Sequence, residues 1–166
     1  MPRPSNESEV TQSIFDRLID HDPRNNAGDE YRTRAQSVRD LKNAVRRDLE
    51  WLLNSRRVAI PPDERLKEVN RSLYVYGLPD FTALSLSDPR DHNKLMRNLQ
   101  SIIQIFEPRL LNPHIATMES SDSHSRTLRF RIEGLLRMDP SPEHVSFDTV
   151  LELTSGEYEV KGDADA

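Results

Sequence analysis

The chain of 166 residues contains no cysteine and no run of 18 apolar residues. The lack of cysteine excludes disulfide bonds and thiolate metal sites, and no stretch has the length expected of a membrane-spanning helix. The formal net charge of −5 argues against a general nucleic-acid binder, which would carry a basic surface. The first residues lack the apolar h-region of a secretion signal. We therefore expect a soluble, cytoplasmic protein with no nucleic-acid partner and no membrane insertion.

Signatures of common catalytic sites are also missing. The sequence holds no Gly-x-Ser-x-Gly elbow, no phosphate-binding loop and no His-Glu-x-x-His motif. The histidines are scattered, mostly at expected loops or element ends, and form no metal-binding pattern: His21, His92, His114, His124 and His144. The residues alone indicate a protein that is not an enzyme, with no catalytic residues, no metal and no cofactor.

The start of the chain predicts a tail and a short amphipathic helix. Residues 1–9 are polar and contain proline, which is typical of a disordered segment. Apolar residues then recur at helical spacing: Val10, Ile14, Phe15, Leu18 and Ile19. Residues 20–29 are rich in Asp, Asn, Pro and Gly and predict a loop. The short helix can dock on a neighbour as an arm or cap its own domain.

A long helix is predicted from Ser37 to about Leu53, because its apolar residues fall on one face. Ser37 is the expected N-cap, and Asp40 gives a loose capping box. The C-terminal half has a basic flank: Arg46, Arg47, Arg56 and Arg57. This flank is either a solvated face or, in a regulatory protein, a docking surface for an acidic partner that depends on Arg46 and Arg47.

Two shorter features precede the next long helix. After Pro61-Pro62, a short helix is expected to carry Leu66, Val69 and Leu73. The following loop holds a glycine and a proline, and its apolar residues should anchor it to the core: Tyr76, Leu78 and Phe81.

Asp88 and Pro89 mark the clearest helix start in the chain, as N-cap and first-turn residue. An apolar stripe then continues to Phe106, so this helix should be the central buried one. It leads into Glu107-Pro108-Arg109, where proline ends the helix and holds the acid and the base at a fixed bend.

The C-terminal third changes from helical periodicity to alternation. Segments 114–119, 127–138, 145–153 and 158–160 predict strands of an antiparallel meander with one face on the helices. Ser120 to Arg126 and Thr154-Ser155-Gly156 predict connecting loops. Arginines on one strand oppose acids on the next, and the last strand is expected to leave an edge available for pairing. The fold class is therefore α+β, with N-terminal helices packed on a small C-terminal antiparallel sheet.

Three roles are open for Glu107 and Arg109. They can form an internal clamp between helix and sheet, or a docking contact that gives register and specificity. A hydrolase would instead use Glu107 as general acid, with Asp148 or Glu152 as the second carboxylate. Arg109 disfavours that third role, because it would lower the pKa of an acid that should be raised.

Several motifs in order resemble the TssE family, the type VI secretion baseplate subunits related to the phage T4 gene 25 wedge protein. The motifs are Ser13-Ile14-Phe15-Asp16-Arg17-Leu18, Arg47-Asp48-Leu49-Glu50-Trp51-Leu52-Leu53-Asn54, Tyr76-Gly77-Leu78-Pro79-Asp80-Phe81, Phe106-Glu107-Pro108-Arg109-Leu110, Leu128-Arg129-Phe130-Arg131-Ile132, Phe147-Asp148-Thr149-Val150 and Ser155-Gly156-Glu157-Tyr158. They cover about residues 11–160, and the Glu-Pro-Arg motif is intact.

The resemblance implies a non-catalytic wedge subunit on the cytoplasmic side of the inner membrane. It implies a fold similar to the C-terminal part of contractile sheath proteins, with TssF, TssG and TssK as baseplate partners. It also implies that strand pairing starts assembly of the TssB/TssC sheath. Glu107, Pro108 and Arg109 inherit a partner-binding role. The family's older label, lysozyme-like, does not imply lytic activity.

The resemblance and the pattern together predict one domain between two tails. Residues 1–9 and 162–166 form the tails, and residues 10–161 form the wedge domain. Within it we expect an N-terminal helix and loop (10–35), a helical part (36–110) and the β-meander (111–161).

Overall fold

The computed structural model describes residues 10, 12–18, 33–80, 88–118, 127–152 and 156–162. Some expectations lie outside these residues: the tail 1–9, the loop 20–29, the anchor Phe81, the loop from Ser120 to Arg126, Leu153 and most of the C-terminal tail.

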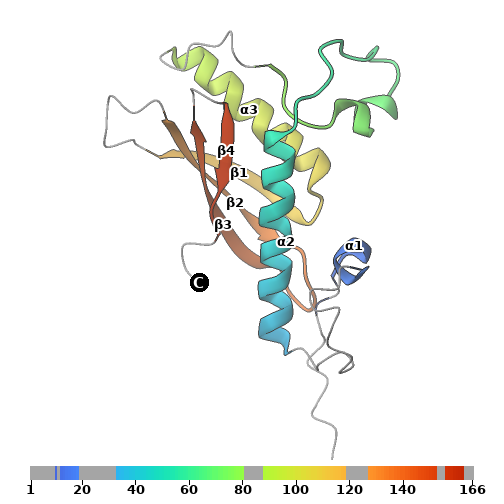
Figure 1. Cartoon of the computed structure of the whole chain (residues 1–166), viewed down its shortest axis with the longest axis vertical. Helices are drawn as coiled ribbons and strands as arrows, with labels where there is room; N and C mark the ends of the chain where they lie inside the picture. Colours follow the sequence, from blue (N-terminus) through green and yellow to red (C-terminus); the bar gives the residue numbers. More distant parts are fainter. Residues whose placement is uncertain are drawn as a thin grey trace, which may run out of the picture.

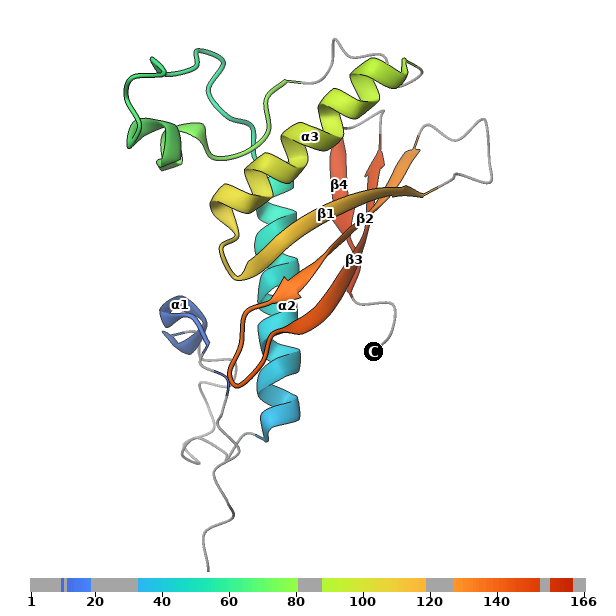
Figure 2. The same cartoon turned by 180° about the vertical axis from the view of Figure 1, so that it is seen from behind.

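The fold places helices first in the chain and an antiparallel sheet last (Figures 1 and 2). The sheet has the order β1-β2-β3-β4, a simple meander. Helix α2 contacts β4 at one side of the sheet, and α3 contacts β1 at the other. The bounds are α1 Ile14–Leu18, α2 Arg34–Asn54, α3 Pro89–Phe106, β1 Leu110–Met118, β2 Thr127–Leu136, β3 Glu143–Glu152 and β4 Glu157–Val160. The predicted α+β class is confirmed.

Helix α2 begins earlier than its sequence predicted, because Thr33 and not Ser37 is the N-cap. Thr33 Oγ1 accepts from Gln36 N at 3.3 Å, and Gln36 Oε1 accepts from Thr33 N at 2.8 Å, which completes a capping box. Ser37 is buried and donates to Thr33 O instead. The assignment of Ser37 and Asp40 as the cap was therefore wrong.

The prediction of a short α-helix that carries Leu66, Val69 and Leu73 is also wrong. Two 3₁₀ turns, η1 Val69–Arg71 and η2 Leu73–Val75, stand in its place. Ser72 is extended between them and its Oγ accepts from Tyr74 N, which interrupts any continuous helix. Leu66 is 51% exposed and Leu73 82%, so these apolar residues supply no core face to hold an α-helix.

Helix α3 and the sheet follow their patterns more closely. Asp88 accepts from Arg90 N at 2.8 Å, and the apolar stripe of α3 is buried. The inner face of β2 and β3 is buried against the helices: Phe130, Ile132, Val145, Phe147, Thr149 and Leu151. Strand β1 starts four residues before its predicted position, because a bulge between Leu111 and His114 accommodates Pro113. The expected charge complementarity is confirmed at Arg131 and Asp148, 2.6 Å apart.

Gly77 lies in the loop after η2, where the loop packs closely against Ser55 at the end of α2. Its φ is +91°, and a Cβ built there would lie 2.5 Å from Ser55 O. That oxygen accepts from Leu78 N at 2.8 Å, while Leu78 O accepts from Arg57 N at 3.0 Å. Glycine at this position therefore permits the two segments to bridge in parallel.

We predict that Gly77→Ala lowers the free energy of unfolding by about 2–4 kcal/mol, because it combines a left-handed backbone with a main-chain clash. Urea denaturation would measure the loss. Gly162→Ala is the matched control, since its Cβ would meet Arg46 Cδ at 3.9 Å, an ordinary van der Waals distance. Equal stability of the two variants would contradict the role given to Gly77.

Candidate functional site

The buried Glu107 and the partly buried Arg109 form an ion pair at the bend between α3 and β1. Glu107 closes α3 by donating from its N to Ile103 O at 2.8 Å. Its two carboxylate oxygens accept from Nε and Nη2 of Arg109, each at 2.5 Å. Its side chain is only 4% exposed, and that of Arg109 is 24% exposed. The rigid bend predicted from Pro108 thus turns the pair inward.

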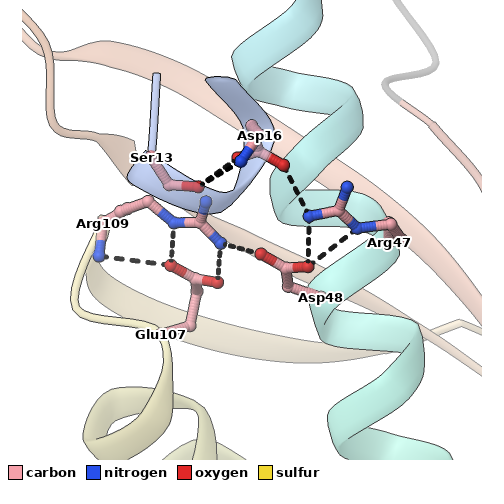
Figure 3. A network of polar contacts seen from close by, with 6 residues as sticks. All are labelled: Ser13, Asp16, Arg47, Asp48, Glu107 and Arg109. Carbon is pink, nitrogen blue, oxygen red and sulfur yellow. Dashed lines mark hydrogen bonds and ion pairs between the residues drawn. The ribbon is translucent and has the colours of Figure 1, made fainter. Parts of the chain in front are cut away.

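The pair continues into a chain of alternating charges (Figure 3). Arg109 Nη2 donates to Asp48 Oδ2 at 2.6 Å, and Asp48 Oδ1 accepts from Arg47 Nε and Nη2 at 2.9 and 2.8 Å. Arg47 Nη2 also donates to Asp16 Oδ1 at 2.8 Å. We call this the charge network: Ser13, Asp16, Arg47, Asp48, Glu107 and Arg109. It links α1, α2 and the α3–β1 bend.

The pKa shifts in the charge network follow from these contacts. Burial alone would lower the pKa of Arg109, but Glu107 and Asp48 outweigh it and raise that pKa, so the guanidinium stays charged. For Asp16, an acid, burial acts in the opposite direction and would raise the pKa. Hydrogen bonds from Ser13 and Arg47 outweigh burial, so the pKa of Asp16 is lowered. Burial, together with the negative charges of Asp48 and Glu107, raises the pKa of the neighbouring Tyr76. The shifts of Arg109 and Asp16 favour the charged states that their ion pairs require.

Helix α1 is held by its polar side and presents its apolar side to solvent. Ser13 donates to Asp16 at 2.5 Å within α1's first turn, and Arg47 fixes Asp16 from α2. The apolar residues of the helix are largely exposed, Ile14 by 73%, Phe15 by 80% and Leu18 by 75%. Trp51 of α2 is 62% exposed and lies beside Arg47, with a cation–π distance of 5.1 Å. The described part of helix α1 therefore does not cap its domain with an apolar face; among the described residues up to Leu18, only Val10, before the helix, is buried.

Three residues of the charge network had no predicted role: Ser13, Asp16 and Asp48. They lie in two of the motifs that carried the family resemblance, and that was their only signal in the sequence. Arg46 and Arg47, expected on a solvated or docking flank, both make internal contacts. Arg46 donates to Val160 O at 3.3 Å, and Arg47 joins the charge network.

The carboxylates proposed for hydrolysis are engaged elsewhere. Both oxygens of Glu107 face Arg109, and Asp148 pairs with Arg131. Within the described segments, no group of three or more His, Cys, Asp or Glu side chains could hold a metal ion. In the same segments, no helix combines the length and the apolar character needed to span a membrane.

The outer edge of β4, expected to be available for pairing, is covered by side chains of α2. Asn54 binds both the N and the O of Tyr158, at 2.9 and 2.8 Å. The availability of this edge was therefore wrongly predicted, because the sequence does not place α2 beside it.

Fold and charge network together define a small α+β scaffold domain in which charged side chains hold surface elements in place. The family described as baseplate wedge protein gp25 matches residues 39–141, and the chain belongs to this family. The family resemblance is thereby confirmed, and with it a structural role in a baseplate alongside other baseplate subunits. The chain is also similar to the anti-adapter protein IraD of Salmonella paratyphi A, with 30% identity over 98 residues, 59% of this chain and 71% of that protein.

We predict that Arg109→Met lowers the free energy of unfolding by about 3–5 kcal/mol, because it leaves Glu107 buried without its partner. Adding Glu107→Gln should restore part of that loss, since it removes the unpaired charge. Chemical denaturation of both variants measures this. Lys161→Met is the control: Lys161 and Glu159 are 3.7 Å apart and mostly exposed, so its cost should stay below about 1 kcal/mol. A double variant less stable than Arg109→Met would refute the buried-charge explanation.

The lowered pKa of Asp16 predicts acid sensitivity of the α1 attachment. A carboxyl with a lowered folded-state pKa stabilises the protein above its ordinary pKa of about 4, and this contribution is lost as the pH falls through the folded-state value. Urea midpoints measured from pH 6 down to pH 2.5 should therefore fall more steeply for the native protein than for Asp16→Asn. Parallel curves would show that Asp16 contributes no pH-dependent stability.

Proposed function

We propose that this chain is a TssE-type subunit of a type VI secretion baseplate wedge. It docks on the wedge subunits TssF, TssG and TssK and starts TssB/TssC sheath assembly by strand pairing, on the cytoplasmic side of the inner membrane. Residues 10–161 act as the wedge domain. The observation that carries the proposal is the charge network, which joins the Glu-Pro-Arg motif to an exposed apolar helix in a member of the wedge family.

In this proposal Glu107, Pro108 and Arg109 support docking largely from within. Glu107 is too buried to offer a free carboxylate to a partner, and Arg109 is already shared between Glu107 and Asp48. Arg109 positions Asp48, Asp48 positions Arg47, and Arg47 binds Asp16. In this way the motif sets the position of α1. The internal clamp and the docking role considered for the motif are then two parts of one function.

The docking surface consists of Ile14, Phe15, Leu18 and Trp51. Large apolar side chains at this exposure are what a partner's apolar face can cover, and aromatic residues among them are typical interface anchors. Its occupant is a wedge core subunit, since the surface adjoins the family's motif and the chain is a wedge protein.

A second function, regulation by binding an adapter protein, is favoured by the similarity to IraD. The sequence predicted that such a regulator would dock through the basic flank of α2, so its binding would depend on Arg46 and Arg47. Both side chains are committed to internal contacts, which disfavours this mode of docking. Peptidoglycan hydrolysis is disfavoured by the engagement of Glu107 with Arg109.

The test is co-purification of wedge subunits with tagged chain from the source cells. We predict that Ile14→Ser and Phe15→Ser reduce recovered TssF and TssG at least about tenfold, the effect of losing an interface hot spot. Because both side chains are exposed, circular dichroism and urea midpoints should stay unchanged. Ile60→Ser is the matched control, since Ile60 is also 73% exposed, and its carbonyl accepts from Tyr74 Oη, which is not part of the charge network.

Each outcome separates the candidate functions. Wedge subunits that are retained by all variants would overturn the α1 surface, and their absence from the native sample would overturn the wedge role. Recovery of a single regulatory adapter instead would favour the second function. Muramidase activity that Glu107→Gln abolishes would restore the hydrolase.

A further inference from the structure

Asn54, the last residue of α2, uses its side-chain amide to join β4 to its own helix. Its Oδ1 accepts from Tyr158 N at 2.9 Å, while Nδ2 donates to Tyr158 O at 2.8 Å and to Glu50 O at 2.9 Å. Two donor hydrogens and one acceptor are therefore all matched. An aspartate side chain could only accept hydrogen bonds, and a leucine side chain could neither accept nor donate them. Neither residue could therefore make these three hydrogen bonds.

The groups that Asn54 binds are those on the outer edge of the sheet. Lys161 N donates to Asp148 O at 2.7 Å, so residue 161 directs its backbone groups toward β3. By the alternation of an antiparallel pair, residues 157 and 159 do the same, whereas Tyr158 and Val160 direct theirs away. Asn54 thus takes the position of a residue in a fifth strand.

Two arginines extend this cover along β4. Arg46 Nη1 donates to Val160 O at 3.3 Å, and Arg56 Nη2 donates to Gly156 O at 3.4 Å. Covering an edge with a helix is a recognised way to prevent further strand pairing. The three side chains bind every outward carbonyl from residue 156 to residue 160.

The opposite edge of the sheet, β1, is also contacted by a helix, α3, but the two edges differ in the hydrogen bonds of their outward backbone groups. Arg137 N donates to Arg109 O, so the odd-numbered residues of β2 direct their backbone N–H and C=O groups toward β1. Their partners on β1 direct the same groups toward β2; these partners are His114, Ala116 and Met118. Ile115 and Thr117 therefore direct their N–H and C=O groups outward. Within the described part of the chain, no side chain is hydrogen-bonded to these groups. The bulge and Pro113 confine the open stretch to residues 114–118.

We propose that Asn54 is a built-in strand surrogate that closes β4 and directs strand addition to β1. The occupant of β1 is an extended segment of a partner subunit, which would pair with the backbone of Ile115 and Thr117 by β-augmentation. This inference rests on the proposed strand-pairing function and specifies which edge performs it.

The closure of β4 is tested without a partner, by amide hydrogen exchange of the full chain followed by NMR. In the native protein Tyr158 N–H should exchange slowly, and Asn54→Leu should accelerate it about tenfold, the factor that corresponds to one hydrogen bond. Asn70→Leu is the matched control, because the Asn70 amide donates to the nearby carbonyls of Asp63 and Leu66, which lie outside the sheet. Equal exchange at Tyr158 in native protein and Asn54→Leu would overturn the surrogate role.

The choice of edge is tested with co-expressed TssB/TssC sheath protein as the probe. On complex formation the amides of Ile115 and Thr117 should become protected by at least about tenfold, while those of β4 stay as they were. Protection of β4 instead would overturn the inference and leave strand pairing intact. Failure to form a complex would overturn strand pairing, and the β1 assignment with it, but the Asn54 comparison would still decide whether β4 is closed.

Discussion

The ion pair between Glu107 and Arg109 is the contact on which the arrangement of the helices depends. A carboxylate that is almost fully buried requires a cation beside it, and Arg109 is held there by the bend that Pro108 creates. Once fixed, the same Nη2 of Arg109 that binds Glu107 also donates to Asp48 on α2. One local constraint between α3 and β1 therefore determines a long-range connection to α2 and, through Arg47, to α1.

Such a network favours specificity of arrangement more than stability. The desolvation of buried charges offsets much of the Coulomb attraction, so apolar residues could hold the same elements together at least as firmly. Apolar contacts would, however, use the apolar side of α1, which is here left free in Ile14, Phe15 and Leu18. Attachment through Asp16 keeps that side exposed while the helix stays in place, and this is the arrangement that a docking element needs.

The sequence predicted the parts of the fold that depend on neighbouring residues. Asp88 and Pro89 started α3 where expected, because the cap and first turn are local. The start of α2 was missed because both Thr33 and Ser37 are suitable caps, and only the partner Gln36 distinguishes them. The start of β1 was missed because Pro113 reads as a break, whereas the sheet absorbs it in a bulge. The charge network was beyond reach, since Arg109 and Asp48 are far apart in sequence and nothing local indicates their contact.

Helix α2 illustrates why a charged flank cannot be interpreted from periodicity alone. Its apolar stripe, which includes Leu49, was predicted correctly as the core face. The remaining surface divides into two further contact faces: Arg47 and Asp48 face α1 and the bend, while Arg46 and Asn54 face β4. Residues 46, 50 and 54 are four apart, so they follow one another along one face of α2, and the first and the last of them bind β4. The motif from Arg47 to Asn54 thus contacts α1 and the bend with one face and β4 with another, so one rigid helix connects the proposed docking surface to the edge that we propose is closed.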